Sequence, residues 1–326
     1  MDYLDAVYGP TEIDRPVLID LMQSAAMQRL RGVLQHGITG LIGITRPTTR
    51  FEHSVGVMLL VQRLGASLEE QIAALLHDVS HTAFSHVIDY VYDGHDRQSY
   101  HEEMKEPHMA ASDLPDVLAT HGYHWRDFLH EEDFALLEQP APALCADRLD
   151  YFLRDSRDLG LASDADIRSA LDHLMVQAGR IAVDEVEAAR WLGDTYLAAD
   201  QASWANFREV GVYELTARAI KIGLKLGTIA ESDFWGADDR LWAKLNATND
   251  PQLQRELSLI SPRTQFVWDE AAPTFYVSTK LRTIDPDVLI DDRVQPLSAI
   301  DAEFARRRLD YLNRHQGKWP MRVIPG

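Results

Sequence analysis

The chain has 326 residues, of which 46% are hydrophobic and 25% are charged, proportions typical of a soluble globular protein. Its formal net charge of −19 argues against a broad nucleic-acid surface, although a few arginines in a cleft can still attract a small anion. There is no run of 18 apolar residues and no basic-then-apolar N-terminus, so neither a membrane span nor a secretory signal is expected. The single cysteine, Cys145, excludes an intramolecular disulfide and a cysteine-based zinc cage, and we expect a cytoplasmic protein.

Apolar residues at helical spacing dominate the first two thirds of the chain. They predict helices over residues 21–36, 53–65, 67–78, 109–122, 127–137, 143–160, 164–178 and 185–227. Ser67 and Glu70 resemble a capping box at the start of the third of these helices. Residues 38–50, with their glycines and proline, are expected to form a loop or a short extended segment, and the polar residues 92–107 a loop.

The character of the sequence changes after about residue 230. Residues 265–269 and 274–279 are predicted to be two short strands that residues 270–273 join into a hairpin, and residues 301–314 to be a terminal helix. The predicted fold class is therefore mainly α. A helical core over residues 1–230 is followed by a smaller mixed α+β extension over residues 231–326.

Two adjacent residues, His77 and Asp78, end one of the predicted apolar helices. A neutral imidazole and a carboxylate in this arrangement can bind one divalent cation, and His53 and Asp147 are candidate partners. His53 begins one predicted helix and His77 ends the next, so antiparallel packing would bring the two ends together. A lone His or Asp is more often a surface or satisfied core residue, but the joint pattern favours a metal site.

The segment after Asp147 repeats polar residues at helical spacing. Asp147, Asp150, Tyr151 and Arg154 are spaced i, i+3, i+4 and i+7, and they share one face of a predicted helix. Asp147 can therefore reach a metal while Tyr151 and Arg154 line the same wall. For any one arginine here, a solvated helix face is the simpler interpretation.

Three blocks of the sequence resemble the HD-domain phosphohydrolases. They are Arg50-Phe51-Glu52-His53-Ser54, Leu76-His77-Asp78-Val79-Ser80-His81-Thr82-Ala83-Phe84-Ser85-His86 and Asp147-Arg148-Leu149-Asp150-Tyr151-Phe152-Leu153-Arg154-Asp155. The resemblance is strongest to the deoxynucleoside triphosphate triphosphohydrolases, the branch that includes the vertebrate SAM-and-HD-domain enzyme; Gln28-Arg29-Leu30-Arg31 and Gln35 match that branch too. It covers residues 28–160 well and the helices to about residue 227 more loosely. A bare His-Asp doublet is a weak signal, whereas three extended blocks in order are a specific one.

The resemblance implies a helical HD fold in which His53, His77, Asp78 and Asp147 bind one divalent cation per chain, which is Mn, Fe, Ni, Co or Mg. In triphosphohydrolases of this type, water attacks the α-phosphorus and nucleoside and inorganic triphosphate are released. The cation lowers the pKa of the water and polarises a phosphoryl oxygen.

The resemblance also implies roles for residues around the metal. Arg50 offsets charge on the phosphate oxygens. His101, oriented by Asp89, is the general acid that protonates the departing 5′-oxygen. His81 and His86 contact phosphate or support the metal ligands. A histidine that merely lies on an exposed loop stays open as the alternative for His101.

The sugar and base contacts match the family only in part. Gln35 fits the glutamine that binds the sugar 3′-hydroxyl, Tyr151 the tyrosine beneath the sugar, and Asp155 an acidic residue that touches it. His36 stands where the vertebrate enzyme has a leucine that helps to exclude a ribose 2′-hydroxyl. Residues 206–208 align loosely with the family's Tyr-Gln-His segment near the base. Neither base selectivity nor a preference for deoxyribose carries over.

The favoured hypothesis is therefore a phosphohydrolase of (deoxy)nucleoside triphosphates, with a small-molecule nucleotide as its partner. The alternatives are hydrolysis of another phosphoester (a nucleoside monophosphate, an alarmone or a phosphorylated metabolite) and a nucleotide-binding HD module without turnover. An HD-type oxygenase would need a second iron and ligands that we cannot assign. A homodimer or higher oligomer is expected. Lys280 and Arg282 either reach a phosphate tail or a neighbouring subunit or, the interpretation we favour, lie on a solvated hairpin.

Overall fold

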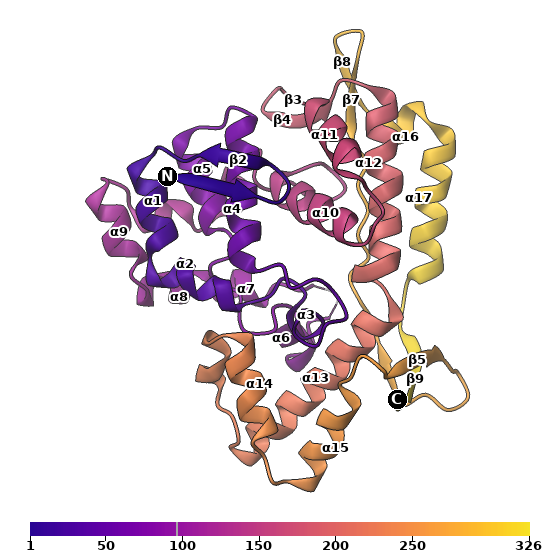
Figure 1. Ribbon diagram of the computed structural model, residues 1–326. Coiled ribbons are helices and arrows are strands. Elements are labelled where there is room, and N and C mark those ends of the chain that lie inside the picture. The colour runs from indigo at the N-terminus through magenta and orange to yellow at the C-terminus, as the bar shows by residue number, and fades with distance from the viewer. Residues whose placement is uncertain (96) are drawn as a thin grey trace.

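The computed structural model describes residues 1–95 and 97–326, and the mainly helical fold class is confirmed (Figure 1). The longer helices are α1 (Pro16–Gln23), α4 (Arg50–Arg63), α5 (Leu68–Leu76), α10 (Ala146–Asp158), α11 (Asp164–Asp172), α12 (Val186–Ala199), α13 (Phe207–Leu226), α14 (Asp238–Asn246), α15 (Pro251–Leu259) and α17 (Ala302–His315). The shorter helices are α2 (Ala25–Arg29), α3 (Gly37–Leu41), α6 (Val87–Val91), α7 (Tyr100–Glu103), α8 (Lys105–Ala111), α9 (Leu114–Thr120) and α16 (Leu297–Ile300). The strands are β1 (Asp2–Asp5), β2 (Gly9–Glu12), β3 (Leu174–Gln177), β4 (Arg180–Val183), β5 (Gln265–Trp268), β6 (Phe275–Val277), β7 (Asp287–Ile290), β8 (Arg293–Pro296) and β9 (Trp319–Ile324).

The helices α4 and α5 pack against each other and position the site. A capping box fixes the start of α4, because Thr49 Oγ1 accepts the Glu52 N–H at 3.1 Å and Glu52 Oε2 accepts the Thr49 N–H at 2.8 Å. At α5 only half of the predicted box forms: Ser67 Oγ accepts the Glu70 N–H at 3.2 Å, whereas the Glu70 carboxylate accepts the N–H of Leu136 at 2.7 Å. A short connection, residues 64–67, lets the two helices pack antiparallel, which places the beginning of α4 beside the end of α5.

The helix α10 packs against α4, and the two approach closely at Gly56. A Cβ atom added to Gly56 would collide with the side chains of Arg154 and Asp150 on α10. The small residue therefore lets α10 lie near enough for its carboxylates to reach histidines on α4 and α5.

Several segments differ from the expected elements. Residues 127–137 form short 3-10 turns and not one helix, and the stretch expected to be helical to residue 178 ends at Asp172 and continues as strand β3. The loop expected over 92–107 contains α7 and the start of α8; Asp96 lies outside the described residues. The helix expected over 185–227 is interrupted by a π-helix at Asp200–Trp204, which separates α12 from α13.

The predicted hairpin of residues 265–279 is wrong in its pairing. Strands β5 and β6 form, but each pairs antiparallel with β9, in the order β5-β9-β6. The hairpin of this region is β7–β8, which turns at Asp291 and Asp292, both with positive φ. The predicted terminal helix is confirmed as α17 and is followed by β9. The alternating pattern of residues 265–279 predicts strands but does not contain their partner, which lies some fifty residues later in the sequence.

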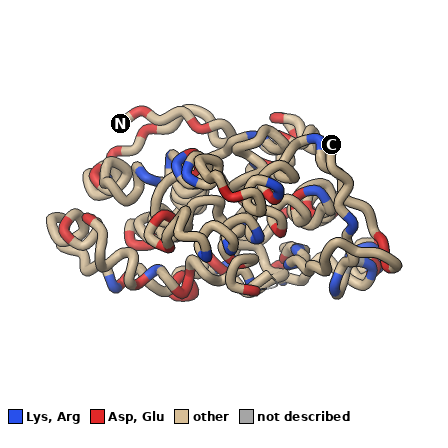
Figure 2. The backbone as a smooth tube through the Cα atoms, turned by 90° about the horizontal axis from the view of Figure 1, so that it is seen from below, with Lys and Arg blue, Asp and Glu red and all other residues tan. Residues whose placement is uncertain are grey.

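The buried apolar side chains form two clusters. One gathers around α1, α4, α5, α10 and α12 and includes Val288 and Phe304 from the C-terminal segment. The other gathers around α13, α14 and α15 and includes Phe84 from the N-terminal half and Met321 from β9. The division at residue 230 stays a prediction, and both clusters contain side chains from each side of it. Basic and acidic positions are interspersed along the backbone in Figure 2.

Candidate functional site

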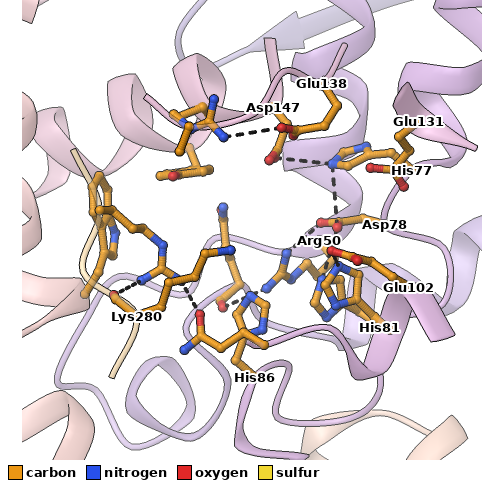
Figure 3. Close-up of a pocket in the computed structure, with 18 of the residues that line it drawn as sticks. Arg50, His77, Asp78, His81, His86, Glu102, Glu131, Glu138, Asp147 and Lys280 are labelled. Atoms are coloured by element: carbon orange, nitrogen blue, oxygen red, sulfur yellow. Dashed lines mark hydrogen bonds and ion pairs between the residues drawn. The ribbon is translucent and has the colours of Figure 1, made fainter. Parts of the chain in front are cut away.

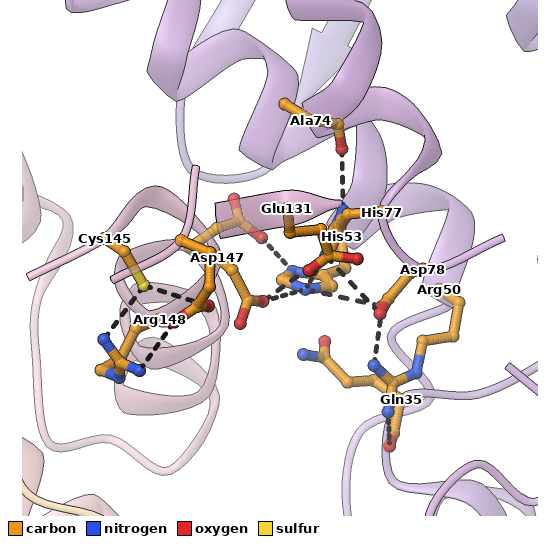
Figure 4. A network of polar contacts seen from close by, with 12 residues as sticks. Gln35, Arg50, His53, Ala74, His77, Asp78, Glu131, Cys145, Asp147 and Arg148 are labelled. Atoms are coloured by element: carbon orange, nitrogen blue, oxygen red, sulfur yellow. Dashed lines mark hydrogen bonds and ion pairs between the residues drawn. The ribbon is translucent and has the colours of Figure 1, made fainter. Parts of the chain in front are cut away.

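Four side chains from α4, α10 and the end of α5 converge on one point (Figure 4). His53 Nε2 lies 2.9 Å from Asp147 Oδ1, 3.3 Å from His77 Nε2 and 3.6 Å from Asp78 Oδ2. His77 Nε2 lies 3.6 Å from Asp78 Oδ1 and 3.5 Å from Asp147 Oδ1. Atoms that bind one cation at about 2.0–2.2 Å must lie within about 4.4 Å of one another. All these distances meet that condition, and His53, His77 and Asp147 each place one ligand atom within 4.8 Å of the others. Asp78 lies beside this group and approaches the two imidazoles through different oxygens.

The chemistry of this group fits a divalent cation. Burial acts to lower the pKa of His77, but the Asp78 and Asp147 carboxylates outweigh it and raise that pKa to about 10. At His53 burial also acts to lower the pKa, but hydrogen bonds to Asp147 and Asp150 outweigh it and raise that pKa. The carboxylates thus favour positive charge between the imidazoles. A cation bound to neutral imidazoles supplies that charge as protons do.

A chain of buried charged groups holds the far side of the His53 ring. His53 Nδ1 lies 2.7 Å from Asp150 Oδ2, and Arg154 donates to both Asp150 oxygens at 2.7 and 3.0 Å. Arg154 also donates to Asp5 Oδ2, in β1, at 2.8 Å. Such contacts fix which ring nitrogen faces a metal. Arg154 therefore lies behind the site and does not line the cavity wall that its spacing predicted.

Arg50 is bonded to one of the candidate ligands. Its Nη1 donates to Asp78 Oδ2 at 2.7 Å and its Nε donates to Ser85 Oγ at 3.0 Å. Both partners of the Arg50–Asp78 pair are buried. The guanidinium therefore orients the Asp78 carboxylate, and its predicted contact with phosphate stays a prediction.

Three further histidines stand beside the metal-ligand group. The ring of His101 stacks on that of His81 with centroids 4.0 Å apart, and His86 meets both rings edge-on. Burial and the Arg50 guanidinium lower the pKa of His81 to about 3, and burial and the neighbouring His81 ring lower that of His101 to about 3. Burial and Arg50 also hold the pKa of His86 well below its usual value. The three rings are therefore neutral around pH 7, and a phosphate placed against them would raise their pKa values.

The structure pairs Asp89 with His86, whereas the sequence predicted that it orients His101. Asp89 Oδ2 lies 3.2 Å from His86 Nδ1, and its Oδ1 accepts the N–H of Tyr100 at 3.1 Å. Asp89 follows His86 by three residues, at the start of α6, and this spacing brings the two side chains together. His101 Nδ1 is buried and has no hydrogen-bond partner among the described residues. The carboxylate–imidazole pair therefore belongs to His86.

A second group of potential ligands adjoins the first. Asp78, His81 and His101 each place one nitrogen or carboxylate oxygen within 4.8 Å of the others. Asp78, a predicted ligand of the first group, falls in this second group by the distances between ligand atoms. These residues could hold another cation beside the first, and metal analysis decides how many ions bind.

The metal-ligand group opens into a cavity of about 690 Å³ (Figure 3). All four predicted substrate-binding residues line it: Gln35, Arg50, Tyr151 and Asp155. His36 also lines it, and its Nε2 lies 3.0 Å from Asp155 Oδ1. Burial acts to lower the pKa of His36, but Asp155 outweighs it and raises that pKa to about 9. The amide oxygen Oε1 of Gln35 is buried without a hydrogen-bond partner among the described residues, so it is available to a ligand hydroxyl.

Aromatic rings form another wall of the cavity. The Tyr151 hydroxyl is hydrogen-bonded to that of Tyr196, and the Trp204 ring meets the Tyr151 ring edge-on with centroids 5.0 Å apart. Trp204 Nε1 donates to Asp155 Oδ2 at 2.6 Å. Sequence reasoning missed Tyr196 and Trp204, which come from α12 and the π-helix. It also missed Asp150 as the partner of His53, although its position three residues after Asp147 signalled a shared face.

Two segments differ from their predicted places relative to the cavity. Lys280 and Arg282, expected on a solvated hairpin, lie at the cavity wall with Thr279 and Thr283; Lys280 is exposed, as expected, whereas Arg282 is half-buried. Residues 206–208, expected near the base, are not among the lining residues that the structure describes. Asn206 instead caps α13 by accepting the Arg208 N–H at 2.9 Å, and Arg208 Nη2 donates to a main-chain oxygen of Pro262.

Among the described residues, no helix combines the length and apolarity needed to cross a membrane.

Comparison with known proteins identifies the family. The HD domain matches residues 50–155. The uncharacterized protein YdhJ of Bacillus subtilis is 41% identical over 294 residues, which cover 90% of each chain. The metal-dependent phosphohydrolase cns2 of Cordyceps militaris is 38% identical over 317 residues, covering 94% of this chain and 91% of the relative. The deoxynucleoside triphosphate triphosphohydrolase SAMHD1 of Gallus gallus is 26% identical over 219 residues, covering 50% of this chain but only 35% of its own length. The chain therefore belongs to the HD-domain family of metal-dependent phosphohydrolases.

Proposed function

We propose that the protein hydrolyses nucleotides at this centre, with (deoxy)nucleoside triphosphates as substrates and nucleoside and triphosphate as products. The observation that carries the proposal is the arrangement of the cavity. Candidate metal ligands occupy one side, and Gln35, Tyr151 and Asp155 offer hydroxyl-binding and stacking groups on the others. A volume of about 690 Å³ is within the range of cavities that enclose ligands of this size.

Each group has a physical role in this proposal. His53, His77, Asp78 and Asp147 would hold a divalent cation, which would lower the pKa of a water molecule and polarise a phosphoryl oxygen. Arg50 would donate hydrogen bonds to phosphate oxygens. A bound phosphate would raise the pKa values of His81, His86 and His101, and one of these imidazoles, once protonated, would pass its proton to the leaving group. The His86–Asp89 pair is the best-supported proton donor, because a carboxylate holds only this imidazole of the three in a fixed orientation from Nδ1.

The charge of the cavity supports a second candidate, a substrate with fewer phosphates. Ten acidic residues line the cavity against five lysines and arginines. The acidic residues are Asp78, Glu102, Glu103, Glu106, Glu131, Glu132, Glu138, Asp147, Asp155 and Glu209. Acidic walls repel a triphosphate more than a monophosphate, because the triphosphate carries more negative charge. Hydrolysis of a nucleoside monophosphate, an alarmone or a phosphorylated metabolite is therefore the alternative.

Product identification tests the proposal. Ribo- and deoxyribonucleotides with one or three phosphates are incubated with the protein and Mn, Fe, Ni, Co or Mg, and the products are separated by chromatography. Nucleoside plus triphosphate is the expected result. Orthophosphate alone supports the alternative, and tight nucleotide binding without products at high protein concentration supports a binding module.

Metal analysis with a matched pair of variants tests the centre itself. The purified protein is expected to contain about one divalent ion at the first ligand group, and Asp78→Ala is expected to lose both metal and activity. Asp310→Ala removes the same charge from an exposed position on α17 and is expected to keep both. Full activity in Asp78→Ala would show that the ligand assignment is wrong.

A further inference from the structure

The positive charges in the cavity are not equivalent. Among the described residues, the lysines and arginines that line it are Arg50, Lys105, Arg148, Lys280 and Arg282. The first three each pair with a carboxylate, at 2.7, 2.6 and 3.3 Å. For Lys280 and Arg282, no carboxylate oxygen of the described residues lies within the 4.0 Å of an ion pair. The unpaired positive charge of the cavity therefore comes from one segment, residues 279–283.

This segment is held in place from several sides. It connects β6 to β7, and the Arg282 N–H donates to Oδ2 of Asp200, the first residue of the π-helix, at 3.0 Å. The Arg282 guanidinium also donates to the side chain of Gln98. Arg308 on α17 donates to Thr283 Oγ1 at 3.0 Å. The segment thus presents its two cations from a fixed backbone, and preorganised groups bind a ligand at less entropic cost.

Lys280 and Arg282 bring two positive charges close together, and Lys280 is the more exposed of the two. Burial and the adjacent Arg282 guanidinium lower the pKa of the Lys280 ammonium. Asp200 and Glu102 act on the pair only from beyond ion-pair distance. An anionic group between the two side chains would offset this repulsion and form charge-assisted hydrogen bonds.

The position of the pair indicates which part of a substrate it would meet. Lys280 lies across the cavity from His77 and Asp78 (Figure 3). The phosphoryl group that reacts must lie at the metal-ligand side, where Arg50 and three histidines already surround it. Groups on the opposite wall are therefore available to a part of the substrate that does not react.

We propose that Lys280 and Arg282 form a second anion-binding subsite, which holds the non-reacting phosphates of a nucleoside polyphosphate. The identity of the substrate at this subsite rests on the proposed function. The two cations would select polyphosphates over monophosphates in an otherwise acidic cavity. The C-terminal segment then contributes specificity to a centre whose chemistry resides in the helical core.

Five variants test the subsite. Lys280→Gln and Arg282→Gln each remove one charge from the cavity wall. Lys225→Gln on α13 and Arg255→Gln on α15 remove the same charges from exposed positions outside the lining. Lys280→Gln is the safer of the first two, because no described residue is hydrogen-bonded to the Lys280 side chain, whereas Arg282 bonds to Gln98. Arg282→Lys keeps the charge and is expected to retain part of the binding.

Calorimetric titration of the metal-loaded proteins with inorganic triphosphate and with orthophosphate gives the direct measurement. In Lys280→Gln and Arg282→Gln the Kd for triphosphate is expected to rise about tenfold or more, as for loss of a charge-assisted hydrogen bond. The Kd for orthophosphate, which needs only the metal side, is expected to stay within about twofold. Unchanged triphosphate binding in both variants would overturn the subsite. So would equal weakening for the two anions, because the residues would then serve the reacting phosphate.

Failure of the subsite and failure of the proposed function give different results. If the wild type releases triphosphate from nucleotides and both variants keep its KM, the function stands and the subsite is overturned. If Lys280→Gln weakens triphosphate binding in a protein that releases nucleoside from no triphosphate, the subsite stands and the proposed reaction is overturned.

Discussion

Asp89 Oδ2 lies 3.2 Å from His86 Nδ1. This contact leaves His86 Nε2 as the ring nitrogen that can face a substrate. The Asp89 carboxylate therefore positions His86, whereas the sequence predicted that it positions His101. Asp89 is itself fixed by the Tyr100 N–H, so the pair is anchored at both ends.

When a proton donor is removed, kcat falls more for a substrate with a basic leaving group than for one with a weakly basic leaving group. We expect His86→Gln and Asp89→Asn to lower kcat on a nucleotide substrate by about 100-fold or more, because the departing 5′-oxygen needs a proton. With p-nitrophenyl phosphate, whose leaving group is weakly basic, the loss is expected to be much smaller. His101→Gln is the comparison: a leaving-group-dependent loss in that variant but not in His86→Gln would restore His101 as the acid.

The close approach of α4 and α10 predicts a distant effect on the metal. Gly56→Ala places a methyl group against Arg154 and Asp150, which hold the His53 ring from behind. Overpacking of this kind costs about 1–3 kcal/mol, and displacement of Asp150 should also release His53. We expect a lower melting temperature and weaker metal binding, measured by differential scanning calorimetry and by competition with a chelator.

Gly236→Ala is the control for that change. Its added Cβ meets only the Asp233 carbonyl oxygen, at 3.2 Å, and touches neither Asp150 nor Arg154. Metal binding as tight in Gly56→Ala as in Gly236→Ala would contradict the role given to the Asp5–Arg154–Asp150 chain.

The buried His36–Asp155 pair predicts a pH-dependent stability. Asp155 raises the pKa of His36 from 6.5 to about 9 against the opposing effect of burial. A raised histidine pKa contributes stability that is fully present below the unfolded value of 6.5 and is lost as the pH rises through about 9. We expect His36→Gln to lower the free energy of unfolding by up to about 3 kcal/mol near pH 6, and by far less near pH 10.

Denaturant unfolding of both proteins across this pH range gives the difference directly. The more exposed pair of His121 and Asp20, 2.8 Å apart, is the control, and His121→Gln is expected to cost less than about 1 kcal/mol at any pH. A pH-independent difference for His36→Gln would mean that the imidazole is not charged in the folded protein.

His36 also predicts the response to the sugar. A polar imidazole beside Gln35 on the cavity wall can accommodate a second sugar hydroxyl, whereas a leucine cannot hydrogen-bond to it. We expect the wild type to hydrolyse ribo- and deoxyribonucleotides with similar kcat/KM. In the double variant His36→Leu/Asp155→Asn, which avoids an unpaired buried carboxylate, the ratio should shift about tenfold toward the deoxyribonucleotide.

The measurement is the ratio of kcat/KM for the ribonucleotide and the deoxyribonucleotide in a competition assay. Partial loss of folded protein affects both substrates equally and leaves this ratio unchanged. An unchanged ratio would show that His36 does not contact the sugar.

The sequence by itself determined the helical class and the four candidate metal ligands, because both depend on local patterns. Helical periodicity predicts α4, α5 and α10, and the residue types around His53, His77, Asp78 and Asp147 are specific enough to mark the ligands before their geometry is known. The order of the three motif blocks added the family.

Other features depend on contacts between distant segments, and only the tertiary structure decided them. The partner of β5 and β6 is β9, far along the chain. Asp89 contacts His86 because the two residues are three positions apart on one helical turn, whereas His101 lies on another helix. Lys280 and Arg282 have the composition of a solvated turn, yet hydrogen bonds from the C-terminal half and the π-helix region turn this segment inward. Local sequence encodes which chemistry a side chain can perform, whereas long-range packing decides which side chains share a cavity.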